Sequence, residues 1–334
     1  MATERKEKML RVLQVMESTD EKSPLNAEQI IEKLNNRFTL GELERRSIYS
    51  DIKMLQYCGY KISKCANPRK GWYMEKHAFE DWEIKIMMDS VEQAQCVSVS
   101  EAAAIKDKLM KLTSDRGRFR FSNMMRTNTK NVDEDKTTGK YIEMLIEAIY
   151  IHKKIEFQYT EVSNDMTRVL RREGKIYKLN LYTIYWSGNN YYLVGAHDNH
   201  DGLTHYRLDR ILNLKISDEK VLDACKKVGP NPEDFIRKYI EESVNHFSGE
   251  AVRIEVEYNP DPVANAILYD FAGKDIKVRK LQDDTYMATF TKMNSVTLTA
   301  WFMQYANRFK VIKPEKLKED VRRELTEAVN KYNE

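Results

Sequence analysis

Apolar residues recur at helical spacing three times in the first part of the chain, within residues 4–17, 26–34 and 43–57. The second pattern begins with an asparagine, a residue that commonly caps helix N-termini. Two short alternating runs follow, at residues 60–63 and 71–74, with a basic loop between them. The pattern therefore predicts three short helices followed by a two-stranded hairpin.

The third helical pattern separates apolar from polar side chains. Ile48, Ile52 and Leu55 recur on one side of the predicted helix. The opposite side collects basic, hydroxyl and aromatic residues, namely Arg45, Arg46, Tyr49, Ser50 and Lys53. A helix of this size fits the major groove of DNA, and side chains of these types bond phosphates and base edges.

Basic charge is concentrated in the first third of the chain. Residues 37–76 contain nine Lys and Arg against four Asp and Glu, and residues 106–130 contain eight against two. The whole chain has a net charge of only +3. This distribution suits a phosphate-binding module, although an ordinary solvated surface would show it as well.

The segment from the third helix to the hairpin resembles the N-terminal domain of DeoR-like regulators. The positions that match the (R)-(T/S)-I-x-x-D-(I/L)-x-x-L-x-x-x-G-x-x-I signature are Arg46, Ser47, Ile48, Asp51, Ile52, Leu55, Gly59 and Ile62. The resemblance implies a winged helix-turn-helix at residues 1–76 that binds a double-stranded DNA operator. We expect DNA contacts at Arg45, Arg46, Ser47, Tyr49, Ser50, Lys53, Arg69 and Lys70. Asp51 is expected to pair inside the domain, and a winged helix used for protein contact alone is the alternative.

Residues 77–139 are predicted to be a helical connector and linker. Residues 79–112 show two helical patterns, and Ser100 is expected to cap the second helix. Residues 113–139 are polar and predict a linker with one short extended piece at residues 119–121.

After a helical pattern at residues 141–150, several short alternating runs predict a small, strongly bent sheet: residues 155–159, 168–172, 174–181, 182–186, 191–196 and 204–211. The segment from Leu181 to Ile211 resembles a WYL domain, an Sm-like β fold. The family's Trp-Tyr-Leu triplet is Tyr191-Tyr192-Leu193 here, and its F-R-x-D-R-(I/M) signature spans residues 206–211. The first triplet position is Tyr instead of Trp, and Leu181 occupies a position where many relatives have Pro.

The WYL resemblance implies an effector-sensing domain at residues 140–222, often for nucleotides or nucleic-acid fragments. Basic and aromatic side chains suit phosphates and stacked bases, so we expect effector contacts from Tyr182, Trp186, Tyr192, His205, Arg207 and Arg210. Arg168, Arg171 and Arg172 could add to a phosphate site. Strand alternation places neighbours on opposite faces, so not all of these residues line one pocket. Alternatively, the aromatic residues belong to the core and Arg210 pairs internally with Asp209.

The sequence favours neither a metal site nor an enzyme. His197, His200 and His205 lie near Asp198 and Asp201, but a polar hairpin tip does not supply the converging ligands that zinc needs. The G-x-S-x-G, H-E-x-x-H, Walker A and G-x-G-x-x-G motifs are absent from the sequence. We expect no cofactor, no metal and no catalytic activity.

Residues 223–334 show the order β-α-β-β-α-β-α, which predicts a ferredoxin-like C-terminal extension with an added helix. The run at residues 311–318 resembles the extension that accompanies many WYL regulators. With 334 residues, 42% of them hydrophobic, the chain is predicted to be an α+β multidomain protein.

Four scattered cysteines, no secretory signal and no apolar run of membrane-spanning length favour a cytoplasmic protein. The leading hypothesis is a homodimeric, ligand-responsive transcriptional regulator that binds operator DNA and a nucleotide or oligonucleotide effector. The alternative is a nucleic-acid-sensing regulatory component of a defence or DNA-processing system that acts through a partner enzyme.

Overall fold

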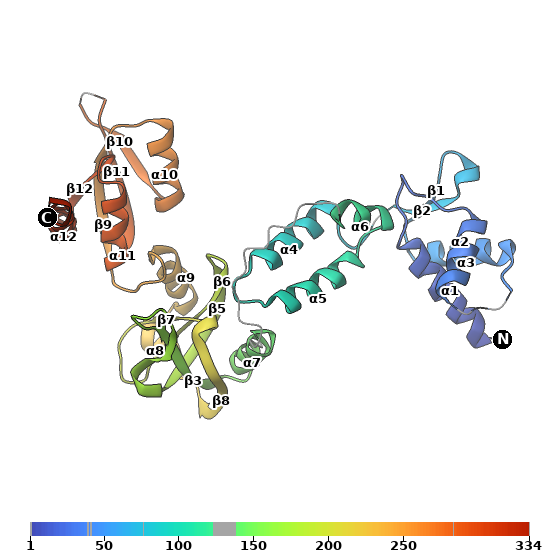
Figure 1. Cartoon of the computed structure of the whole chain (residues 1–334), viewed down its shortest axis with the longest axis horizontal. Coiled ribbons are helices and arrows are strands. Elements are labelled where there is room, and N and C mark those ends of the chain that lie inside the picture. Colours follow the sequence, from blue (N-terminus) through green and yellow to red (C-terminus); the bar gives the residue numbers. More distant parts are fainter. Residues whose placement is uncertain are drawn as a thin grey trace. The chain divides into compact units, whose positions relative to one another are not determined.

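The computed structural model describes residues 2–38, 40, 42–75, 77–122, 138–282 and 284–333. The chain divides into two compact units, Met1–Thr138 and Gly139–Glu334 (Figure 1). The four-part division predicted from the sequence stays a prediction, because the structure groups the residues as two units. Among the described residues, no helix is both long enough and apolar enough to cross a membrane.

The first unit begins with three helices and an antiparallel hairpin, as predicted. These elements are α1 (Ala2–Met16), α2 (Ala27–Arg37), α3 (Arg45–Tyr57), β1 (Ile62–Lys64) and β2 (Trp72–Met74). Asn26 caps α2, since its side chain accepts from the Gln29 amide and the Gln29 side chain accepts from the Asn26 amide. The buried residues Val12, Ile30 and Ile48 come from three different helices, so the helices share one core.

The hairpin is tied to the segment before α2 by a close backbone approach. Leu25 and Trp72 exchange two N–H···O=C hydrogen bonds, each of 2.9 Å. Gly71 lies beside this bridge with a φ of 92°, and a Cβ there would lie 1.9 Å from the Leu25 carbonyl oxygen. Only glycine satisfies both the left-handed backbone and the close approach.

The rest of the first unit is helical: α4 (Asp81–Gln93), α5 (Val99–Met110) and α6 (Asp115–Ser122). The cap of α5 is Ser98 instead of Ser100, because the Ser98 side chain accepts from the Glu101 amide. The predicted extended piece at residues 119–121 is wrong, since these residues belong to α6. The alternation of basic and aromatic residues there covers too few positions to distinguish a strand from a helix whose Phe121 is buried.

Ion pairs hold α6 against α2. The Asp115 carboxylate lies 2.6 Å from the Lys33 ammonium and 3.4 Å from the Arg37 guanidinium, and these cations lower the pKa of Asp115 although burial opposes them. The N-terminal part of the predicted linker at residues 113–139 is therefore folded. Its residues 123–137 lie outside the described part of the chain.

Helix α7 (Thr138–Tyr150) leads into the second unit and its first sheet. The strands of this sheet are β3 (Lys153–Val162), β4 (Arg168–Leu170), β5 (Ile176–Ser187), β6 (Asn190–Ala196), β7 (Thr204–Arg207) and β8 (Ile211–Lys220). Their order is β4-β3-β5-β6-β7, β8 pairs with β3, and every pairing is antiparallel. Leu145 and Ala148 of α7 pack against Phe157 and Leu193 of the sheet.

Several of the predicted strands are divided or joined differently in the structure. The strand predicted at residues 168–172 ends at Leu170, and Arg171–Gly174 form a 3₁₀ turn. Residues 174–186, predicted as two strands, form the single strand β5, whose register shifts between Leu181 and Thr183. The run at residues 204–211 is instead divided by a 3₁₀ turn, Leu208–Arg210. A bulge and a tight turn both interrupt strict alternation, and sequence periodicity does not distinguish them.

Helices α8 (Cys225–Val228) and α9 (Pro232–Glu242) connect this sheet to a second one. The remaining elements are β9 (Glu250–Tyr258), α10 (Pro262–Ala272), β10 (Lys277–Lys280), β11 (Tyr286–Asn294), α11 (Val296–Gln304), β12 (Phe309–Lys313) and α12 (Glu315–Asn333). The β-α-β-β-α-β-α order is the predicted one, and the antiparallel sheet has the order β10-β11-β9-β12. Ile254 and Phe290 face a core completed by Leu268 and Phe302 from the helices.

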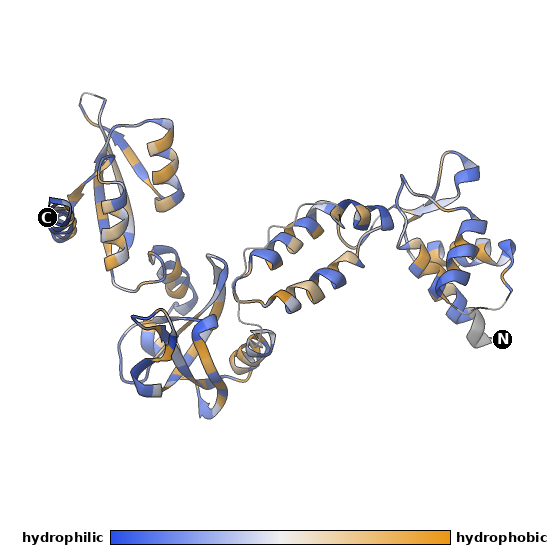
Figure 2. Cartoon of the chain, viewed as in Figure 1, coloured by the Kyte–Doolittle hydropathy of each residue, from blue (hydrophilic) through white to orange (hydrophobic). Residues whose placement is uncertain are grey.

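Hydrophobic and hydrophilic residues interleave along most elements of both units (Figure 2). This is the pattern of amphipathic elements that pack on one side. A smaller apolar cluster links the two sheets of the second unit, because Val194 of β6 and Met293 of β11 both pack with Tyr239 of α9.

Candidate DNA-binding and effector-binding surfaces

Helix α3 presents a buried side and an exposed side, as its sequence pattern predicts. Ile48, Ile52 and Leu55 are at most 2% exposed. Ser47 is half-buried, and the other predicted contact residues of this helix are exposed: Arg45, Arg46, Tyr49, Ser50 and Lys53. The five exposed residues of this helix make up what we call the α3 surface, whereas the Ser47 hydroxyl donates to the Glu44 carbonyl within the helix.

The residues of the α3 surface differ in whether their side chains already contact other residues of the protein. Arg45 forms an ion pair with Glu28 of α2, and Tyr49 packs against Trp72 of the hairpin with the ring centroids 5.2 Å apart. Arg46 and Lys53 have no ion-pair partner among the described residues. These two cations are therefore the ones most available to an external phosphate.

Two further predictions in this unit concern charge. Asp51 lies on α3 but pairs internally, since its carboxylate is 2.9 Å from the Lys8 ammonium of α1. Arg69 and Lys70 are exposed in a short 3₁₀ turn, Pro68–Lys70, between the two strands of the hairpin. The hairpin loop therefore presents two cations to solvent.

The predicted effector residues of the second unit do not share one face of its first sheet, and Arg210 lies in the 3₁₀ turn Leu208–Arg210 between β7 and β8. Tyr192 is opposite Arg207 in the β6–β7 register and opposite Tyr185 in the β5–β6 register, so these three side chains share a face. His205 is two residues before Arg207 and lies on the same face. Trp186 is opposite Tyr191 on the other face, where the two rings meet edge to face at 4.9 Å.

Arg207 is engaged in an internal ion pair. Its guanidinium donates two hydrogen bonds of 3.0 Å to the two carboxylate oxygens of Asp209, which is 9% exposed, and a third of 3.3 Å to Asn190. Arg168 donates to the Asp209 carbonyl at 2.8 Å. The internal partners of the Asp209 carboxylate therefore include Arg207 and Arg168, and the pairing of Asp209 with Arg210 stays a prediction.

A chain of hydrogen bonds joins the neighbours of Tyr192, from His246 through Tyr185 and His205 to Ser243. The Tyr185 hydroxyl lies 3.0 Å from Nδ1 of His205 and 2.7 Å from Nδ1 of His246, whose ring stacks on Tyr192 at 3.6 Å. Ser243 donates to the Tyr239 carbonyl at 2.5 Å, so His205 Nε2 must donate to the Ser243 hydroxyl. Neutral His205 then accepts from Tyr185, and Tyr185 accepts from His246.

Burial controls the protonation of this cluster. Desolvation, with a smaller contribution from His246, lowers the pKa of His205 to about 4. Burial also lowers the pKa of His246 and raises that of Tyr185. At neutral pH these three groups are therefore uncharged, and the formal positive charge of this face is that of Arg207, which is paired with Asp209.

Tyr182 lies apart from this cluster. It packs at the edge of the apolar cluster around Tyr239, and its buried hydroxyl has no hydrogen-bond partner among the described residues. Burial, followed by the charges of Asp198 and Asp223, raises the pKa of Tyr182 to about 12. The sequence pattern missed Tyr185 and His246, because the β5–β6 register brings Tyr185 beside Tyr192, and the turn after α9 brings His246 to the same place through tertiary contacts.

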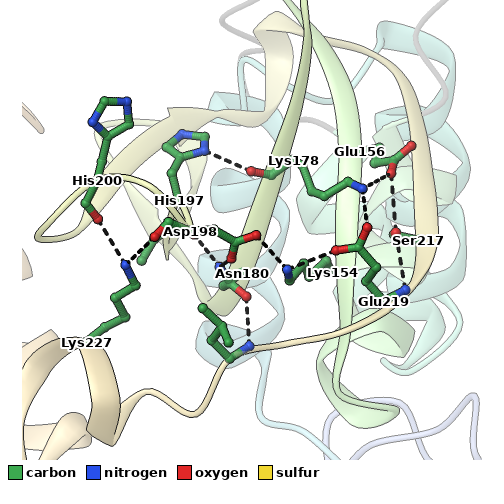
Figure 3. A network of polar contacts seen from close by, with 12 residues as sticks. Lys154, Glu156, Lys178, Asn180, His197, Asp198, His200, Ser217, Glu219 and Lys227 are labelled. Carbon is green, nitrogen blue, oxygen red and sulfur yellow. Dashed lines mark hydrogen bonds and ion pairs between the residues drawn. The ribbon is translucent and has the colours of Figure 1, made fainter.

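A polar network fixes the loop after β6 (Figure 3). Lys154 donates to Asp198 at 2.8 Å and to Glu219 at 3.0 Å, and Asn180 donates to the same aspartate at 2.8 Å. Lys227 donates to the backbone carbonyls of Asp198 and His200. Within the described residues, no group of three or more His, Cys, Asp and Glu side chains could hold a metal ion.

Comparison with protein families identifies two domains in the second unit. The model of the WYL domain matches residues 140–216, and the model of the WCX domain matches residues 249–329. The chain therefore contains a WYL domain and a WCX domain. The DeoR-like character of the N-terminal helices stays a prediction. No functionally curated protein matches the chain.

Two solved structures align with nearly the whole chain at low similarity. Proteasome accessory factor B/C (PafBC) of Arthrobacter aurescens is 14% identical over 98% of this chain, with a TM-score of 0.29, and the chain spans 49% of its length. A CRISPR Cas-related protein is 14% identical over 93% of both chains, with a TM-score of 0.39. At these scores neither structure supports an argument about function.

Proposed function

We propose that this protein is a DNA-binding transcriptional regulator whose WYL domain binds a nucleotide or nucleic-acid effector, and that it has no catalytic activity. The observation that supports DNA binding best is the α3 surface, where two cations without ion-pair partners lie beside exposed tyrosine and serine side chains. Arg46 and Lys53 would contact phosphates or guanine edges, and Arg69 and Lys70 the neighbouring backbone.

Effector binding is proposed for the sheet face that contains Tyr192, His205 and Arg207. Tyr185 and His246 belong to the same face, and α9 and the segment before the WCX domain lie against it. An effector that displaces these contacts would change how the WYL and WCX domains pack, and a population shift of that kind would alter DNA binding in a homodimer.

DNA binding is tested by selecting bound sequences from random double-stranded DNA with the full-length protein. We expect an operator with two related half-sites, because a two-fold dimer reads two copies of its site. Arg46→Ala should weaken operator binding by about 10-fold, the value of one good phosphate or base contact. Failure of the wild-type protein to select any sequence would refute specific DNA recognition.

The alternative function, a nucleic-acid sensor acting through a partner enzyme, predicts a different result. Such a protein would bind nucleic acid through its WYL domain while Arg46→Ala left all nucleic-acid binding unchanged. No observation on the described residues favours this alternative over transcriptional regulation.

A further inference from the structure

Two adjoining hollows lie beside the C-terminal part of α9, against the WCX domain. The larger, of about 700 Å³, is lined by α9, the end of α10 and β11, and the smaller, of about 430 Å³, by α10, α11 and the segment after α9. The two share Asp270, Phe271 and Lys292, so one molecule can reach both. Small-molecule sites commonly have volumes of this order. The effector-face residues Tyr192 and His205 line neither hollow.

Lys292 is the cation at the place where the two hollows meet. It lies near the end of β11, opposite Val252 of β9. Its side chain is half-buried, and desolvation lowers the pKa of Lys292 although the charges of Glu242 and Glu241 oppose it. The other cations of the larger hollow are all exposed, namely Lys238, Arg253, Lys274 and Lys277. Lys292 is therefore the least hydrated cation of the two hollows.

The contacts of the Lys292 ammonium use only part of its hydrogen-bonding capacity. The ammonium donates to the Glu241 carbonyl at 2.7 Å, at the end of α9, and lies 5.6 Å from the centroid of the Phe271 ring. An ammonium has three N–H donors, and Lys292 has no ion-pair partner among the described residues. A partly desolvated cation gains most from an anion in direct contact. An anion that enters the hollows would therefore bind at Lys292.

The charge around Lys292 favours an anion with a single negative charge. The larger hollow is lined by five Lys and Arg and by four Asp and Glu, the acidic residues being Glu241, Glu242, Asp270 and Asp275. One carboxylate is balanced by the excess of one positive charge. A phosphate dianion would add a second negative charge beside four carboxylates, and like charges at short range are costly. The lining therefore suits a carboxylate better than a phosphate.

The smaller hollow provides an apolar wall next to Lys292. The rings of Phe271 and Trp301 stack with their centroids 3.7 Å apart, and the Tyr305 ring lies 5.1 Å from that of Trp301. All three rings are only half-buried. Ile267 also lines this hollow. An apolar ligand body gains free energy by covering such a wall, so the ligand should have an apolar part next to its carboxylate.

We propose that the two hollows bind a small organic carboxylic acid as its monoanion. The carboxylate accepts hydrogen bonds from the Lys292 ammonium, and the apolar body lies against Phe271, Trp301 and Tyr305. This site uses none of the residues assigned to DNA binding or to the effector face, so it does not depend on the proposed function.

The test measures binding to the full-length protein by calorimetry. The probes are 3-phenylpropanoate, its neutral amide 3-phenylpropanamide, propanoate and inorganic phosphate. We expect 3-phenylpropanoate to bind and the amide to bind at least ~10-fold more weakly, because it cannot accept a charge-assisted hydrogen bond. Propanoate should also bind more weakly, because it covers less of the apolar wall. Inorganic phosphate should not displace 3-phenylpropanoate.

Matched variants locate the carboxylate. Lys292→Met keeps an apolar side chain but removes the ammonium, so it should weaken 3-phenylpropanoate binding at least ~10-fold. Lys292→Arg keeps the charge and should retain most of the binding. The control is Lys316→Met, which replaces an exposed lysine of α12 outside both hollows and should leave binding unchanged.

Three results would overturn the proposal. The first is a wild-type protein that does not bind 3-phenylpropanoate at millimolar concentration, and the second is equal affinity for the carboxylate and its amide. The third is a Lys292→Met variant that binds 3-phenylpropanoate as tightly as wild-type. If that variant has a lower melting temperature but unchanged affinity, Lys292 only caps the end of α9. Operator binding, measured on the same samples, reports on the proposed function separately.

Discussion

Replacing Arg207 by alanine should destabilise the second unit, because it removes the main partner of a buried carboxylate. The Asp209 side chain is 8% exposed and that of Arg207 is 29% exposed. Breaking a fully buried pair costs about 3–5 kcal/mol. We expect a smaller cost here, about 2–3 kcal/mol, because Arg207 is partly exposed and because Arg168 lies 3.5 Å from the same carboxylate. For a domain of this size the melting temperature should fall by about 5–10 °C.

The assay is thermal unfolding of the full-length protein followed by circular dichroism. The control is Arg322→Ala, which replaces an exposed arginine of α12. A double variant, Arg207→Ala with Asp209→Asn, should recover part of the lost stability, since the amide leaves no buried charge. Two results would refute an ion pair that stabilises the fold. One is an unchanged melting temperature in Arg207→Ala, and the other is a double variant whose loss of stability equals the sum of the losses in the two single variants. Loss of effector binding in Arg207→Ala alone therefore does not identify a contact residue.

Two further predictions concern the backbone and pH. Gly71→Ala should destabilise the first unit more than Gly59→Ala does. Both glycines have a φ above 90°, but only at Gly71 would a Cβ clash with the Leu25 carbonyl. Equal melting temperatures for the two variants would contradict the close approach of Gly71 to Leu25. The folded-state pKa of His205 is lowered to about 4, so the unfolded chain binds more protons and stability should fall as pH decreases from about 6.5 towards 4. Comparing His205→Gln with wild-type across that range checks the assignment, because the variant should show a shallower loss.

The sequence predicts much of the fold where one residue pattern determines one element. The alternating sides of α3 place Ile48 and Ile52 inside and Arg46 and Lys53 outside, as the structure shows. The β-α-β-β-α-β-α order of the C-terminal part is also recovered. In both cases the hydrophobic period alone decides the outcome.

The candidate sites are less predictable, because they depend on which strands pair and in which register. The alternation of residues within each strand does not relate the face of Tyr192 to that of Trp186. The β5–β6 pairing shows that these two side chains lie on opposite faces of the sheet. The partner of Asp209 and the position of His246 follow from tertiary contacts in the same way.

The central claim is that the α3 surface binds DNA phosphates, and the salt dependence of operator binding tests it most directly. Lys53→Ala should reduce the slope of log affinity against log salt by about one unit, since one phosphate contact fewer releases fewer counterions. Lys108→Ala, an exposed lysine on α5 of the same unit, should leave both slope and affinity unchanged. Equal slopes for wild-type and Lys53→Ala, or an equal loss in both variants, would contradict the assignment of α3 as the DNA-reading helix.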